Sequence, residues 1–537
     1  MAIAGARIDR RDMLRILGAT AATLALPHGA AFAQGRKDTL VLGLDFSYTL
    51  NLDPARALNF TGPETVSAAY ETVLTFSAGD YINLKPLLAT AWKRTPDGKG
   101  WRLTLRDGVK FASGNVMTAD DVKFSIDRVI NLKDQPSQYL TNLARVEIVD
   151  PGTVDLILKD PAAPILTILT GPSFSIVDRK TVEALGGTSG ADAKEKDKAS
   201  EALNQNSAGT GPFKLTKWER NGQIQLVANP NYWRGKPPFQ RIVIRHMDES
   251  GAQLLALRNG DIDAAFNLTP EQVEGLKSSK DVHVVSHTSL DFVYLALSSN
   301  PEFNPALARK QARQAVGYAI DYDGIRDALF GGAATRPASF LPIGMIGSTE
   351  EVVREIGFRQ DLEKSRKLLA DAGLPQGFEF EMSYGNGAVS GSSFNVLAQK
   401  IQADLARVGI KAKLVPMDMT TFRTQFVGQK SKAAITTWTP TGIENQQWAS
   451  SSVERVAKRV HWTPSDEMLK LVDRAAAETD RKKQAELWKE YQVAMVDQAN
   501  LIMLFQPVFR VGVRNEIKSF PLTAAGWKVE LFDVKRG

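Results

Sequence analysis

Few residues of this sequence could do chemistry, and they form no recognised catalytic arrangement. None of the 537 residues is cysteine, which excludes disulfides, cysteine-ligated zinc and thiol nucleophiles. No nucleophile elbow, P-loop or dinucleotide-binding glycine fingerprint occurs in the right context. Asp261 and Asp263 in "NGDIDAAF" fit a helix-to-strand turn as well as they fit an acid–base pair. We therefore expect no enzymatic activity and no cofactor.

Histidine supplies the remaining potential metal ligands, and its spacing argues against a metal site. His283 and His287 are four residues apart in "DVHVVSHTS", a β-branched run that reads as a strand. A strand rises ~3.3 Å per residue and would hold the two side chains ~13 Å apart, too far for one ion to bind both. His246 and His461 have no acidic or histidine neighbour in a recognised spacing. We predict no metal site.

The stretch most suited to ligand binding is "AITTWTPTGIENQQWASSSVE" at 434–454. A short predicted strand ends at Trp438, and the loop after it holds a second tryptophan and a single carboxylate. Small-molecule sites are usually lined by aromatic side chains with a few polar groups. The candidate site residues of this loop are Trp438, Thr439, Thr441, Glu444, Asn445, Gln446 and Trp448. The alternative is that both tryptophans pack beneath the loop as part of the core.

The order of predicted elements places this loop at one edge of a sheet. Strands at 378–384, 410–416 and 433–438 alternate with helices at 392–408 and 419–427, which predicts a mostly parallel sheet covered by helices. Open α/β sheets bind ligands outside the carboxyl ends of their strands. The loop "SYTLN", with Tyr48, follows the first predicted strand and is a second loop of this kind.

Two further segments carry expectations about structure. "LIMLFQPVFRVGV" near the C-terminus reads as a final pair of strands. The polar segment 188–207 has few large apolar residues and reads as an exposed helix or linker.

The N-terminus has the layout of a cleaved export signal. A basic start with the pair Arg10-Arg11 precedes an apolar run from Ile16 to Leu26, and Ala31-Phe32-Ala33 follows before Gln34. The run is too short for a transmembrane span of ~20 residues. The arginine pair favours the twin-arginine route over the general one. We expect residues 1–33 to be removed near Ala33/Gln34 and the mature protein to be periplasmic.

The charge of the chain does not indicate a nucleic-acid partner. The formal net charge is +6. Residues 1–33 contribute four arginines and two aspartates, which leaves +4 for the mature chain. No run of basic residues is interleaved with aromatic ones. We expect a monomer that does not bind nucleic acid.

Several stretches resemble one family, the family 5 extracellular solute-binding proteins of peptide- and nickel-type ABC importers. "GWRLTLRDGVKFASGNVMTADDVKFSIDRV" is the most specific, and "GTGPFKL", "NPNYW" and "ARQAVGYAID" agree in the right order. The family positions kept in the first stretch are Trp101, Leu105, Arg106, Gly108, Val109, Phe111, Gly114, Thr118, Ala119, Asp121, Val122, Phe124 and Ser125.

The resemblance implies an α/β, two-lobed periplasmic-binding-protein-like fold with an additional inserted domain and a hinge between the lobes. It implies a first lobe of residues 38–80, 207–285 and 500–537, an inserted domain of 81–206, and a second lobe of 286–499. The implied function is capture of a peptide or similar mid-sized polar solute by hinge closure. The implied partner is an ABC transporter permease at the inner membrane.

The resemblance also raises a question about the ligand. Peptide binders of this family often carry an aspartate three residues after the tryptophan of this loop, where it pairs with the peptide ammonium. Here that position is Thr441, and Glu444 is a possible substitute. Arg336 could bind a carboxylate or phosphate, or it could be a solvated surface residue. The alternatives therefore include an opine, a sugar conjugate or a blocked peptide, and less readily a nickel complex or a secreted enzyme.

Overall fold

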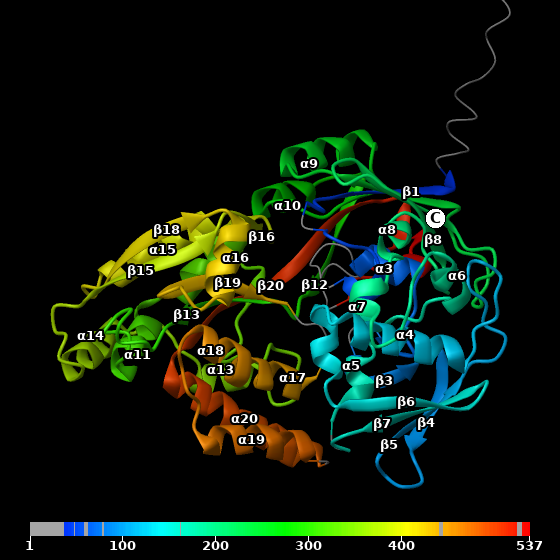
Figure 1. Ribbon diagram of the computed structural model, residues 1–537. Helices are drawn as coiled ribbons and strands as arrows, with labels where there is room; N and C mark the ends of the chain where they lie inside the picture. Colours follow the sequence, from blue (N-terminus) through cyan, green and yellow to red (C-terminus); the bar gives the residue numbers. More distant parts are fainter. Residues whose placement is uncertain are drawn as a thin grey trace, which may run out of the picture.

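Two lobes and a smaller domain with its own sheet make up the molecule (Figure 1). The computed structural model describes residues 37–47, 49–57, 63–77, 80–161, 163–439, 444–478, 480–523 and 529–537. A mixed sheet of 12 strands runs through both lobes, and a separate sheet of four strands forms the smaller domain. The export signal predicted at 1–33 lies outside the described residues.

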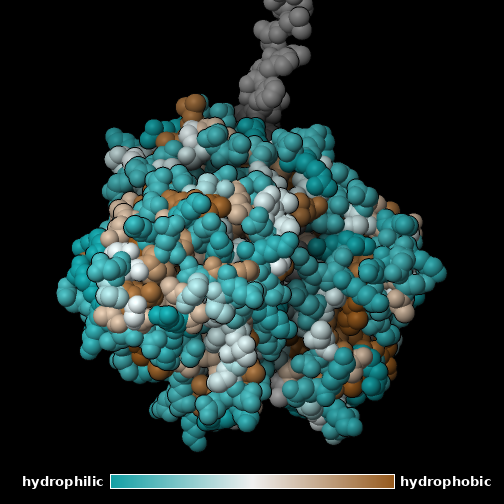
Figure 2. Space-filling model, turned by 60° about the vertical axis from the view of Figure 1, so that its left-hand side comes forward, coloured by the Kyte–Doolittle hydropathy of each residue, from teal (hydrophilic) through white to brown (hydrophobic). Residues whose placement is uncertain are grey.

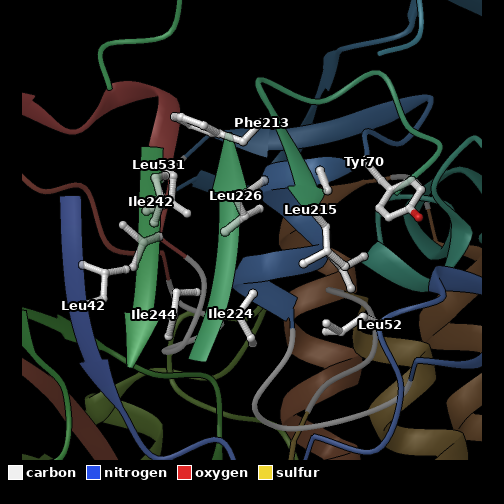
Figure 3. Packing of buried hydrophobic residues seen from close by; sticks show 14 of the residues in the cluster. Leu42, Leu52, Tyr70, Phe213, Leu215, Ile224, Leu226, Ile242, Ile244 and Leu531 are labelled. Atoms are coloured by element: carbon white, nitrogen blue, oxygen red, sulfur yellow. The ribbon is translucent and has the colours of Figure 1, made fainter. Parts of the chain in front are cut away.

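The first lobe is built on parallel pairing of β1 (Thr39–Leu44) with β10 (Arg241–His246) and β11 (Ala264–Ala265). β9 (Gln223–Ala228) and β8 (Phe213–Trp218) extend the sheet antiparallel. Leu42, Ile242 and Leu226 are at most 1% exposed, and Figure 3 shows them packed together from neighbouring strands. The helices of this lobe are α3 (Pro63–Ala69), α9 (Ser250–Asn259) and α10 (Pro270–Leu276).

The second lobe confirms the predicted parallel unit. β15 (Glu379–Gly385) pairs parallel with both β18 (Lys411–Met417) and β19 (Ala433–Trp438). The crossover helices are α15 (Phe394–Ala406) and α16 (Met419–Val427). On the far side of β19, β13 (Phe292–Leu297) pairs antiparallel. Both faces of the sheet are covered, as parallel strands require.

β13 separates two cores of the second lobe, because alternate residues of a strand face opposite sides. Val293 and Leu295 belong to a core with α11 (Lys310–Ala319) and α14 (Leu362–Asp371). Phe292 and Tyr294 belong to the other core. The helical segments on that second side are α17 (Asn445–Ser450), η5 (Ser451–Val456), α18 (Ala457–Arg459), α19 (Asp466–Ala477) and α20 (Arg481–Gln498). We call this second side the helical face.

A single long strand, β20 (Leu501–Arg514), joins the two lobes. Residues 501–505 pair with β13, and residues 508–514 pair with β12 (Val282–Thr288). The prediction of a strand pair here was wrong. Pro507 lies where β20 changes partners, at the short strand β14 (Ala334–Thr335). A missing N–H is tolerated at such a junction, so the proline does not end the strand.

The strand directions make the carboxyl ends of the two sheets face each other along β20. β19 runs in the same direction as β20, because each is antiparallel to β13. β1 runs in the opposite direction, because it is parallel to β11 and β11 is antiparallel to β20. The end of β19 at Trp438 therefore points toward the first lobe, and the end of β1 points toward the second.

The smaller domain contains β4 (Ala89–Arg94), β5 (Gly100–Leu105), β7 (Thr153–Leu158) and β6 (Leu143–Asp150), in that order across the sheet. α4 (Ala119–Leu132) packs on it and begins with a capping box between Thr118 and Asp121. We call this unit the four-stranded domain.

A buried ion triad fastens the four-stranded domain to the first lobe. Arg128 of α4 binds both oxygens of Asp53, at 2.8 and 2.6 Å, and both oxygens of Asp197, at 2.8 and 3.0 Å. All three side chains have 0% exposure. The expectation that 188–207 is simply exposed was therefore wrong, because Asp197 turns inward to satisfy Arg128.

A second buried carboxylate, that of Glu71, accepts hydrogen bonds from residues of two sequence motifs. Glu71 accepts hydrogen bonds from the Thr210 hydroxyl at 2.8 Å, the Tyr232 hydroxyl at 3.0 Å and the Trp233 indole at 2.9 Å. Burial raises the pKa of Glu71, and these three donors lower it again in part. The motifs "GTGPFKL" and "NPNYW" thus stabilise the first lobe.

The crossing point between the lobes is held by one buried glutamine. The Gln506 amide donates to Ser289 O at 2.7 Å and Ile343 O at 3.0 Å, and its oxygen accepts from Ile343 N at 2.8 Å. Two residues after Ser289, the Oδ1 atom of Asp291 is shut off from solvent without a hydrogen-bond partner among the described residues. Burial raises the pKa of Asp291 to about 8, although Ser289 and Thr439 lower it in part.

We predict that Arg128→Met lowers the free energy of unfolding by about 3–5 kcal/mol, because it leaves the buried Asp53 without its counter-ion and leaves Asp197 with only the more distant Arg56, 3.8 Å away. The matched control is Arg145→Met, since Arg145 forms an exposed ion pair with Glu147 at 2.6 Å and should contribute less than about 1 kcal/mol. Urea unfolding followed by circular dichroism measures both. Equal losses in the free energy of unfolding for the two variants would show that the buried triad contributes no more than an exposed ion pair.

We predict that Asp291→Asn changes how stability depends on pH. The pKa of Asp291 is raised to about 8 in the folded protein, so between about pH 4 and pH 8 the folded state holds a proton that the unfolded chain has released. The wild-type protein should therefore lose up to about 1.4 kcal/mol per pH unit across this window as pH rises. The asparagine variant should lack this component and gain most relative to wild type near pH 8.

Unfolding titrations at several pH values measure this difference, with the exposed Asp261→Asn as control. A wild-type pH profile that Asp291→Asn leaves unchanged would contradict the assignment of a protonated Asp291.

Candidate ligand-binding site

The facing carboxyl ends of β1 and β19 define the region where the candidate residues should meet. Tyr48 and Thr441, which the sequence places in the loops after these strands, lie outside the described residues, as do residues 440–443. The remaining candidates are described, and the structure divides them into four groups.

Trp438 and Thr439 remain at the end of β19, where the sequence predicts ligand contacts. Both are half-buried. The Trp438 ring packs edge-on against Phe340, with centroids 5.0 Å apart. Thr439 lies beside the carboxyl group of Asp291. These two residues present one aromatic surface and one hydroxyl at the edge of the sheet.

Trp448 and Asn445 are taken up by the packing of α17. Trp448 is 1% exposed and belongs to the core of the helical face. Asn445 is also 1% exposed and donates to Ile346 O at 2.7 Å. The alternative of core packing therefore describes Trp448, while Trp438 retains an accessible edge.

Glu444 begins α17 as its N-cap. Its Oε1 accepts a hydrogen bond from Gln446 N at 3.2 Å. Burial raises its pKa, and the backbone donors of Gln446 and the positive charge of Arg481 lower it in part. This carboxylate is thus already engaged in capping a helix, which stabilises it without any ligand.

Arg336 lies on the other side of the second lobe. Its guanidinium packs over the Tyr322 ring, 4.0 Å from the centroid, and donates to Phe358 O. Tyr322 and Phe358 belong to the core on the α11 and α14 side of β13. Arg336 and Trp438 thus belong to opposite sides of β13, and the binding of a carboxylate or phosphate by Arg336 stays a prediction.

Arg455 is the most informative residue that the sequence analysis missed, because it reaches from the second lobe to the four-stranded domain. It lies in η5, and it donates to Gln138 Oε1 at 2.9 Å and to the Tyr139 hydroxyl at 3.3 Å. Both partners lie in η2 (Gln135–Leu140) of the four-stranded domain. Figure 1 shows α17 and α18 on the side of the second lobe that faces this domain.

Aromatic rings surround the same guanidinium. Its carbon lies 5.2 Å from the centroid of Tyr139 and 5.4 Å from that of Trp438. Trp438 is therefore the sequence-predicted residue that the structure places beside the point of contact between the two units.

Arg459 follows one helical turn later and is also half-buried. Burial lowers its pKa, and the positive charges of Arg455 and Arg423 lower it further, while the hydroxyls of Tyr294 and Tyr139 raise it. The Tyr294 hydroxyl is buried without a hydrogen-bond partner among the described residues. The four-residue spacing of the two arginines is also that of an ordinary exposed helix face, so the sequence alone does not single them out.

In the described part of the chain, no group of three or more histidine, cysteine or acidic residues is arranged to hold a metal ion. Likewise, none of the helices described there is long and apolar enough to cross a membrane. Figure 2 shows a face on which hydrophilic residues predominate and hydrophobic ones are scattered.

Comparison with known proteins agrees with this architecture. Residues 83–453 match the family described as bacterial extracellular solute-binding proteins, family 5. A probable D,D-dipeptide-binding periplasmic protein, DdpA of Escherichia coli K12, is 27% identical over 507 residues, which cover 93% of this chain and 94% of the relative. The dipeptide-binding protein of the same organism is 27% identical over 504 residues, covering 87% and 90%.

Solved structures share the fold at lower identity. The binding protein AgaA from A. tumefaciens R10, solved in complex with agropinic acid, superimposes with a TM-score of 0.76 at 22% identity and covers 93% of this chain and 99% of its own. The α/β, two-lobed periplasmic-binding-protein-like fold expected from the sequence is thereby confirmed. The chain belongs to the family 5 bacterial extracellular solute-binding proteins.

Proposed function

We propose that this protein is the periplasmic receptor of an ABC importer, which captures a peptide or similar mid-sized polar solute between its lobes and delivers it to an inner-membrane permease. The observation that carries the proposal is that the carboxyl ends of β1 and β19 face each other along β20, with Arg455 reaching across to Gln138 and Tyr139. Two loops that meet only when the lobes are closed can enclose a ligand.

For the lobes and the inserted domain, we keep the boundaries that the resemblance implies. We propose a first lobe of 38–80, 207–285 and 500–537, an inserted domain of 81–206, and a second lobe of 286–499. The ligand-facing residues proposed from them are Tyr48 on the first lobe with Trp438, Thr439 and Thr441 on the second. We further propose a monomer without enzymatic activity, exported after removal of residues 1–33.

A second candidate ligand class is a blocked peptide, an opine or another acid conjugate. Two observations favour it. Thr441 stands where peptide-binding relatives often carry an aspartate, and Glu444 is engaged as a helix cap. In addition, AgaA, which shares the fold, was solved with agropinic acid. Under this alternative the receptor role is unchanged and only the ligand differs.

A thermal-shift screen tests the receptor proposal. Panels of di- and tripeptides, their N-acetylated forms, opines and sugars should include one class that raises the melting temperature, because a ligand bound at 100 times its Kd stabilises the folded state by about 2.7 kcal/mol. Equal stabilisation by free and acetylated peptides would exclude ammonium recognition through Glu444. Trp438→Ala should weaken the response, and Trp233→Phe, at a half-buried tryptophan of the first lobe, provides a control remote from the loop.

Turnover of any stabilising compound, followed by chromatography after prolonged incubation, would contradict the receptor proposal. So would a small-angle scattering profile that shows no compaction when the stabilising ligand is added.

A further inference from the structure

Arg455 and Arg459 bring two positive charges into a partly enclosed space between the second lobe and the four-stranded domain. Both are half-buried, and neither forms an ion pair within 4.0 Å with a carboxylate of the described residues. The partners of Arg455 are neutral: Gln138, Tyr139 and, at 2.6 Å, the Ser451 hydroxyl. This arrangement is unusual, because partly buried guanidinium groups normally have a counter-ion.

Arg459 is the less satisfied of the two. Its guanidinium carbon lies 5.4 Å from the centroid of the Phe426 ring. The side chains that affect its pKa are Tyr294, Arg455, Arg423 and Tyr139. Two of these are positive and two are hydroxyls, so none of them is a carboxylate that could neutralise its charge.

The buried hydroxyl of Tyr294 has no hydrogen-bond partner among the described residues, and an acceptor atom near Arg459 would supply one. Tyr294 lies on the helical face of β13, beside Phe340, with ring centroids 5.2 Å apart. A buried hydroxyl without a partner costs free energy, and an acceptor placed between it and Arg459 would remove that cost. Guanidinium donors, hydroxyl donors and aromatic walls together suit an anion with an organic body.

We propose that Arg455 and Arg459 bind an anionic group of the captured solute, with Tyr139 and Gln138 of the four-stranded domain closing beside it. This inference rests on the proposed receptor function and specifies the ligand class as acidic. An anion would neutralise both guanidinium groups at once, and the contact across the lobes would then form most favourably around the ligand.

Matched pairs of probes test the charge requirement. The pairs are an alanyl dipeptide and its C-terminal amide, an opine-type N-carboxyalkyl amino acid and its methyl ester, and glucose 6-phosphate and glucose. The acidic member of at least one pair should raise the melting temperature of the wild-type protein while its neutral partner does not. The pair that responds distinguishes a carboxylate from a phosphate.

Two variants locate the charge requirement at these residues. Arg459→Gln and Arg455→Gln should each weaken binding of the responding acid by about 10- to 100-fold in titration calorimetry, the effect of removing a charge-assisted hydrogen bond. The control is Arg354→Gln on the same lobe, where an exposed arginine lies 3.7 Å from Glu350, and its affinity should match wild type. Unchanged affinity in Arg459→Gln would overturn the proposal.

The unliganded protein supplies a readout that needs no ligand. Removing one of two like charges should raise the melting temperature of Arg459→Gln above wild type at low ionic strength, and the gain should shrink at high salt. A lower melting temperature at low salt would assign Arg459 a structural role and overturn the proposal. If neutral solutes bind wild type and both variants equally well, the acidic site is rejected while the receptor function stands.

Discussion

The structure depends on the continuity of β20. One strand supplies ladder hydrogen bonds first to β13 in the second lobe and then to β12 and β11 in the first. Backbone pairing of this kind fixes direction and register on both sides, so the orientation of the other strands of the 12-stranded sheet follows from it. The facing carboxyl ends, and with them the ligand site that we propose, are a consequence of this one shared strand.

The side chains around the crossing add specificity to that backbone frame. Gln506 satisfies three backbone groups in a fully buried position, which fixes where the chain segments cross. Asp291 and Tyr294, on either side of Phe292, each leave a buried polar atom without a partner. Unsatisfied groups of this kind are rare in protein interiors and cluster at functional positions. Their nearness to Trp438 and Arg459 is consistent with a site that a ligand completes.

Sequence reasoning predicted the parallel unit of the second lobe, because strand and helix periodicities alternate there without interruption. It failed at Pro507, which reads as a strand breaker unless the change of partner strands is known. It also failed at Asp197, whose burial depends on an arginine 69 residues away.

The candidate site was only partly predictable for similar reasons. Composition singled out both tryptophans of the loop, but only the start of α17 determines that Trp448 turns into the core. Arg455 and Arg459 resemble ordinary helix-surface residues until the four-stranded domain is placed opposite them. Arg336 was singled out from the sequence, but the sequence does not show that it lies on the other side of β13 from Trp438.

The triad of Arg128, Asp53 and Asp197 has a mechanical consequence. It joins the four-stranded domain to the first lobe through a buried ionic contact, and the backbone N–H of Ile176 adds a second attachment by donating to Glu71 O at 2.9 Å. The two units should therefore rotate together as one rigid body. A rotation between the lobes about the crossing at Gln506 would then carry Tyr139 away from Arg455 and break the contact between them.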